Sequence, residues 1–69
     1  NANGSFTNDN NYVVYEFDIF EKNDNIMTKQ FYIVGDYKYV LVHETVYNFP
    51  SDEVDAVTKK IVNSFEWKD

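Results

Sequence analysis

The sequence predicts an α+β domain in which a three-stranded antiparallel meander precedes one C-terminal helix. The first observation is that residues 12–20, 26–34 and 37–47 are rich in aromatic and β-branched residues and are separated by short polar loops. The second is that Pro50 ends the last of these segments, and apolar residues recur at helical spacing after it. We therefore expect the β-β-β-α domain to span residues 12–69.

The first eleven residues, NANGSFTNDNN, contain five asparagines and a single aromatic residue. This composition favours turns and frayed ends over regular elements, so we expect residues 1–11 to be a flexible tail or linker. Within it, Asn3-Gly4-Ser5 matches the acceptor pattern for N-glycosylation, a short pattern that occurs often by chance.

The first two predicted strands are Tyr12–Phe20 and Ile26–Val34, joined by the polar loop Glu21–Asn25. In the first strand, polar and apolar residues alternate, which is typical of a half-buried strand. A two-residue turn at Gly35-Asp36, with glycine first, fits a type II′ hairpin and leads to the third strand.

The predicted helix runs from about Asp52 to Asn63. Ser51 is a suitable N-cap, and we expect its side chain or backbone to meet the amide of Glu53 or Val54. Acidic residues in the first turn suit the positive end of the helix dipole. After the helix, Phe65 and Trp67 predict a short extended tail that packs back on the body.

The predicted loop lengths set a register. The Gly35-Asp36 turn pairs Phe31 with Val40, and a five-residue first loop pairs Tyr15 with Phe31. One face of the sheet then carries Val13, Tyr15, Phe17, Ile19, Met27, Phe31, Ile33, Val40 and Val42. The helix should cover this face, with a buried centre formed by Phe31, Ile33, Val40, Val42, Val57, Ile61 and Phe65.

The opposite face is polar at one end, with Glu16, Asp18, Thr28, Gln30 and His43. Near the Gly35 turn it becomes aromatic, and we predict a protein-contact surface formed by Tyr12, Val14, Tyr32, Tyr37 and Tyr39. The alternative is ordinary cross-strand packing of tyrosines whose hydroxyls stay in water. One helix cannot cover both faces, so water, a second chain or an absent segment must meet these tyrosines.

Composition excludes several classes of partner. The net charge is −6, from twelve acidic residues and six lysines, which disfavours nucleic acid and anionic membranes. No apolar run is long enough for a transmembrane segment. The chain has no cysteine and one histidine, so we expect no disulfide, no zinc site and no cofactor.

No set of residues predicts catalysis. The expected register aligns His43 with Asp18 and Thr28, but two strand spacings, about 10 Å, separate the outer pair. Asn23-Asp24-Asn25 lacks the glycine and the distal glutamate of a calcium loop. We interpret Glu16 and Asp18 as a solvent-facing pair, and expect Lys29 to form a rim ion pair with Glu44.

Residues 31–68 resemble the C-terminal half of PsbP/Mog1-like domains. The shared features are the hairpin, the long last strand, the helix opened by Ser51 and the ending IVNSFEW, similar to an apolar-apolar-x-Ser-Phe-x-Trp close. The resemblance implies half of an α/β/α sandwich, and a non-catalytic accessory role of the kind found in small exported bacterial lipoproteins. It favours an extracytoplasmic or cell-surface location in a bacterium. The family fold is about twice this length, and the chain starts with Asn, so we expect a fragment, a mature form or a trimmed chain.

Two functions follow as hypotheses. The first is a non-enzymatic interaction or accessory domain that meets a protein partner, or a second copy of itself, through the tyrosine-rich face. The second is a small acidic regulator, such as an immunity protein, an inhibitor or a secretion chaperone, that masks a basic surface. A double-stranded RNA-binding domain has a similar order of elements, but it also needs a first helix and a basic second helix, which are not found here.

Overall fold

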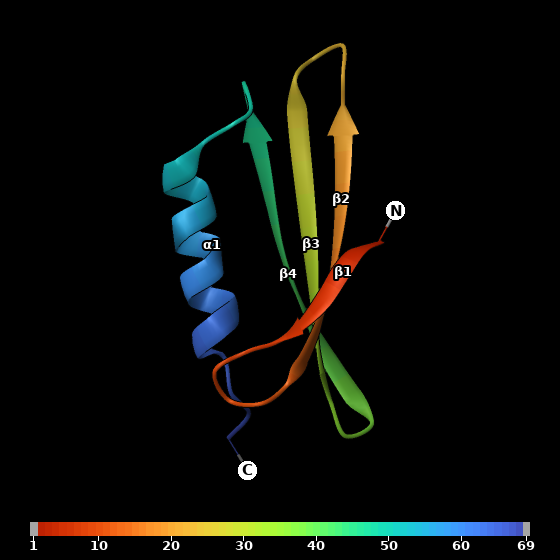
Figure 1. Ribbon diagram of the computed structural model, residues 1–69, viewed down its shortest axis with the longest axis vertical. Coiled ribbons are helices and arrows are strands. Elements are labelled where there is room, and N and C mark those ends of the chain that lie inside the picture. Colours follow the sequence, from red (N-terminus) through yellow and green to blue (C-terminus); the bar gives the residue numbers. More distant parts are fainter. Residues whose placement is uncertain (1, 69) are drawn as a thin grey trace.

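The computed structural model describes residues 2–68, with side chains from residue 4 onward, as one antiparallel sheet and one helix (Figure 1). The elements are β1 (Ala2–Thr7), β2 (Val13–Glu21), β3 (Ile26–Gly35), β4 (Lys38–Tyr47) and α1 (Asp52–Ser64). The strands lie side by side in the order β1-β2-β3-β4. The α+β class, the antiparallel sheet and the C-terminal helix are confirmed, but the described sheet has four strands instead of three.

The additional strand, β1, lies in the segment that was predicted to hold no element. Ala2–Thr7 pairs antiparallel with β2, so that Ser5 lies opposite Tyr15 and Thr7 opposite Val13. The prediction of an irregular tail is therefore wrong for residues 2–7. The asparagines of this segment argue against a strand, but most of the described ones lie in the turn that follows β1. Ser5, Phe6 and Thr7 extend readily along the edge of β2.

The β2–β3 register differs from the prediction by one residue. Glu21 lies opposite Ile26, so the loop holds four residues, and Tyr15 lies opposite Tyr32 instead of Phe31. Asn25 ends the loop with a φ of 53°, a left-handed conformation that asparagine tolerates. Because side chains alternate along a strand, this slip exchanges the two faces of β2.

The β3–β4 register differs by two residues, so its faces are as predicted. The turn residues are Asp36 and Tyr37, and Tyr37 has a φ of 57°. Gly35 is required for a reason other than the predicted turn. A Cβ atom there would lie 2.8 Å from Cζ3 of Trp67, so only glycine lets the indole ring pack against the strand.

The core lies between the sheet and the end of the chain. Its buried centre consists of Val14, Phe31, Ile33 and Val62, with Tyr12, Val40, Val42, Phe65 and Trp67 packed around them. The predicted return of the tail is confirmed, since the Trp67 ring lies 4.9 Å from Tyr12 and 4.8 Å from Phe65 between centroids. The placement of Val57 and Ile61 in the core is wrong, because these side chains are 57% and 50% exposed.

The helix is rotated relative to the prediction, and Thr58 and Val62 are its buried residues. It makes most of its strand contacts with β4, beside which it lies in Figure 1. Its start is as predicted, because the Ser51 hydroxyl accepts a hydrogen bond of 3.3 Å from the Val54 amide.

The C-terminal end of α1 is capped by the loop between β1 and β2. The last turn holds no basic residue. Asn8 Nδ2 donates hydrogen bonds of 3.0 Å to the carbonyls of Val62 and Phe65, and the Asp9 amide donates one of 3.1 Å to Asn63. Asn10 Nδ2 donates further hydrogen bonds to the carbonyls of Ser64 and Phe65. The carbonyls that a helix end leaves without partners are thus satisfied by distant asparagines.

Asn8 also organises its own loop. Its Oδ1 atom accepts 3.0 Å hydrogen bonds from the amides of Asn10 and Tyr12, and the residue is buried. One side chain therefore fixes the turn that starts β2 and the end of α1.

We predict that Asn8→Asp destabilises the domain by about 2–4 kcal/mol, at the upper end of the cost of unpaired buried groups. One oxygen of the new carboxylate can still accept the hydrogen bonds of the loop amides. The other replaces the donor and lies against the Val62 and Phe65 carbonyls, where it is repelled by them and by the negative end of the helix dipole. Asn23→Asp is the matched control in an exposed loop. Urea unfolding followed by circular dichroism measures both, and equal losses in the two variants would contradict the capping role.

Candidate functional site

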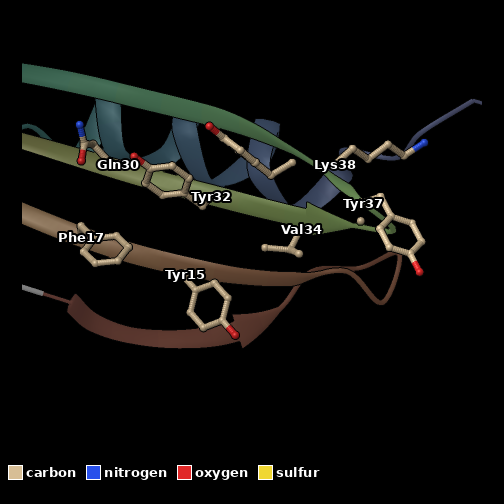
Figure 2. Close-up of a pocket in the computed structure, with 9 residues that line it drawn as sticks. Tyr15, Phe17, Gln30, Tyr32, Val34, Tyr37 and Lys38 are labelled. Atoms are coloured by element: carbon tan, nitrogen blue, oxygen red, sulfur yellow. The ribbon is translucent and has the colours of Figure 1, made fainter.

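The sheet face opposite α1 carries an aromatic groove, shown in Figure 2. It is a hollow of about 620 Å³. Its walls come from β2, β3, β4 and the turn between the last two. The lining residues, called here the aromatic groove, are Tyr15, Phe17, Gln30, Tyr32, Val34, Gly35, Tyr37, Lys38 and Tyr39.

Strand alternation brings these side chains together. Tyr15 lies directly opposite Tyr32, and Val34 directly opposite Tyr39, so each pair points to the same face. Tyr37 joins them from the turn, where its side chain projects fully into solvent.

The rings contact one another across the strands. The centroids of Phe17 and Tyr32 are 5.7 Å apart in an edge-to-face arrangement, and those of Tyr32 and Tyr39 are 5.6 Å apart. Much of this aromatic surface still faces solvent, because Tyr15 is 46% and Tyr39 is 66% exposed. Lys38 is the one ionisable residue besides the tyrosines in the lining, so the groove offers apolar area and hydroxyl groups.

The structure divides the five predicted contact residues between the two faces. Tyr32, Tyr37 and Tyr39 line the groove. Val14 is completely buried in the core, and the Tyr12 hydroxyl accepts a 3.3 Å hydrogen bond from the Trp67 amide. These two are on the helix side because β2 slips by one residue.

The same slip explains what the prediction missed. Tyr15 and Phe17 were assigned to the face that the helix covers, but they line the groove on the opposite face. The segment VVYEFDIF is apolar in both alternating rows at its start, so it was a signal that both faces of β2 carry apolar residues. Alternation predicts that the more apolar row, with Tyr15 and Phe17, faces the helix, whereas the structure places the row of Glu16 and Asp18 there.

The alignment of His43 with Asp18 is also wrong. Asp18 lies opposite Lys29, whereas His43 lies opposite Gln30 on an exposed position of β4. Within residues 2–68, no group of His, Cys, Asp and Glu side chains is arranged to hold a metal ion. No helix in this described part of the chain is long and apolar enough to cross a membrane.

Carboxylates collect on the other face, between α1 and the sheet. A cleft of about 410 Å³ is lined by Glu16, Glu44 and Asp55 together with Lys29 and Lys59. Lys29 lies opposite Glu44 in the register. Its Nζ atom, however, lies 3.5 Å from Asp55 Oδ1, so the ion pair is formed with the helix. Glu44 is only 6% exposed, so its carboxylate is shielded from most of the solvent.

This environment favours protonated carboxyls. Burial raises the pKa of Glu16 to about 7, and the neighbouring Asp18 adds to the rise while Lys29 and Lys59 oppose it. Burial likewise raises the pKa of Glu44, and Asp55 adds to that rise. The prediction that Glu16 and Asp18 face solvent as a pair is wrong, because both are half-buried on the helix side.

We predict that the domain gains stability as the pH falls from about 8 to about 5.5. Glu16 has an ordinary pKa of 4.5 when unfolded and about 7 when folded, so the folded state takes up its proton first. Protonation in this window therefore favours folding, and the gain is lost as the pH rises through 7. Thermal unfolding at the two pH values measures the effect.

The variant Glu16→Gln should flatten this pH dependence, because it removes the proton uptake of the folded state. Glu66→Gln, at an exposed position in the tail, is the matched control and should keep the wild-type profile. A Glu16→Gln profile as steep as that of the wild type would contradict the assignment.

Comparison of the chain with protein-family models, with curated proteins and with solved structures gave no match. The resemblance of residues 31–68 to PsbP/Mog1-like domains therefore stays a prediction. What the groove does has to be inferred from its own geometry.

Proposed function

We propose that this chain is a non-enzymatic protein-interaction domain that binds the apolar side of an amphipathic helix in its aromatic groove. The observation that carries the proposal is the groove itself, a hollow of about 620 Å³ lined by aromatic rings, of which Tyr15, Tyr37 and Tyr39 are exposed. Isolated exposed aromatic residues are common, but a contiguous set on one sheet face is typical of a surface that meets another protein.

The chemistry of the groove supports an apolar partner. Its wall combines aromatic rings with Val34, and Lys38 and Gln30 lie at its border. Tyrosine suits such a surface, because its ring buries apolar area while its hydroxyl keeps a polar partner. A charged partner segment would lose water here without gaining a countercharge.

Layer architecture favours a helix as the occupant. One sheet face carries α1 and the chain end, while no element of the described residues lies in front of the opposite face in Figure 2. A packed layer of helices is one of the two kinds of layer that cover the apolar face of a sheet. The PsbP/Mog1-like resemblance supports the same arrangement, since it implies a sandwich of which this chain forms half. The helix would then come from a partner or from another part of a longer protein.

The net charge of −6 favours a second candidate, the small acidic regulator. Such a protein would mask a basic surface with its carboxylates, and the aromatic groove would be secondary. Its binding would weaken strongly with salt, because screening acts on exposed charges. Binding in the groove would depend much less on salt.

We predict that replacing Tyr32 and Tyr39 together by Ser weakens partner binding by roughly 100-fold or more, since central interface tyrosines often contribute about 2 kcal/mol each. Proteins retained from a cell extract by the immobilised wild-type chain should be lost from the variant. Ile19→Ser is the matched control, because Ile19 is 53% exposed on β2 but outside the groove lining.

The experiment separates the two candidates. Partners that stay bound to the double variant but elute in high salt would support the acidic regulator instead. Light scattering of the free chain checks self-association, and a dimer that dissociates in the double variant would make a second copy the occupant. Unchanged circular dichroism in the variants shows that the core is intact.

A further inference from the structure

A second unoccupied surface lies at the β4 edge of the sheet. β4 pairs with β3 on one side, and no strand within residues 2–68 pairs with its other side. It is 10 residues long and contains neither proline nor glycine. Proteins usually protect such an edge, because its free backbone groups readily pair with another strand.

The helix exposes an apolar stripe beside this edge. Val54, Val57 and Ile61 are spaced by three and four residues, so they share one side of α1. They are 37%, 57% and 50% exposed, respectively. We call these three residues the helix stripe.

The direction of the stripe follows from the other residues of α1. Asp55 and Lys59 line the cleft that also holds Glu16 of β2 and Lys29 of β3, so that side of the helix faces the middle of the sheet. The helix stripe lies on the other side of the buried residues Thr58 and Val62, and therefore points past β4. In Figure 1 α1 accordingly lies beside β4, at the border of the sheet.

An added strand would fit between these two features. It would lie about 4.8 Å from β4, the spacing of paired strands, and hence beneath the helix stripe. Its backbone would complete the edge, and every second side chain would pack against Val57 and its neighbours. The remaining side chains would lie on the open face beside Tyr39 and Tyr47, which are 66% and 70% exposed.

We propose that the β4 edge and the helix stripe together bind one extended segment of a partner protein, with apolar residues alternating with basic ones. The apolar residues face the stripe and the basic ones face the tyrosine rings, which attract cations. The charge supports this occupant over a second copy, because two chains would bring together two net charges of −6.

The probe is a synthetic peptide of alternating Val and Lys, as long as β4. Titration into the isotope-labelled chain should shift the amide resonances of β4 and saturate. A peptide of the same composition with its valines and lysines in separate blocks is the control for unspecific charge attraction. Methylation of alternate backbone nitrogens on the paired side should abolish binding, because it removes ladder hydrogen bonds.

Val57→Ser together with Ile61→Ser should weaken peptide binding by roughly tenfold or more, because the stripe loses its apolar groups. Both side chains are at least half exposed, so the fold should survive. Ile19→Ser should leave peptide affinity unchanged, because Ile19 is 53% exposed on β2 and lies in neither the aromatic groove nor the helix stripe. The helix stripe lies outside the groove lining, so loss of peptide binding in the Val57 and Ile61 variant tests this site and not the function proposed for the groove.

Two outcomes would overturn the proposal. Equal binding of the alternating and the block peptide would show that charge alone attracts them. A dimer of the free chain that dissociates when Val57 and Ile61 are replaced would show that a second copy takes the site. Saturable binding of the alternating peptide alone, lost on backbone methylation, is the expected result.

Discussion

The hydrogen bonds between Asn8 and the end of α1 hold together parts of the chain that little else connects. The helix buries only Thr58 and Val62, so its apolar attachment to the sheet is small for its length. The side-chain Nδ2 atom of Asn8 donates hydrogen bonds to the Val62 and Phe65 carbonyls, and its Oδ1 atom fixes the turn into β2. The position of the helix, the start of β2 and the return of the tail thus depend on one buried polar group. A small domain without disulfides gains in this way a fixed geometry that its core alone would not provide.

Local signals in the sequence were sufficient for some elements and insufficient for others. Ser51 marked the helix start, and the aromatic residues of the tail marked its return to the body. The face of β2 was predicted wrongly, because alternation favours burial of the row with Tyr15 and Phe17, and because the loop to β3 is one residue shorter than its polar composition indicated. The role of the asparagines was also hidden, because their partners lie more than fifty residues away in the chain. Strand β1 was missed because its own residues are mostly small and polar, and they extend only along the edge of β2.

The candidate site was predicted in part because three of its tyrosines belong to the hairpin whose faces were assigned correctly. The exchange of the β2 faces moved two aromatic residues outward and placed carboxylates beneath the helix. Aromatic residues on the open face and carboxylates on the helix side are the reverse of the usual preference for burying apolar and exposing charged side chains. Local preferences that conflict with the fold in this way are expected where a surface serves binding. The bare edge of β4 and the helix stripe belong to the same pattern, since each leaves apolar or backbone groups without a protein partner in the described chain.

The contact between Gly35 and Trp67 has a practical consequence for spectroscopy. The chain has one tryptophan, and its six-membered ring lies against the glycine backbone, with Tyr12 and Phe65 edge-on to it. The α-protons of Gly35 therefore lie in the shielding region of the indole ring current and should resonate at unusually high field. That signal reports whether the chain end is docked, and the fluorescence of the lone indole follows the same event in dilute solution. Both can be read without a label and without knowledge of the partner.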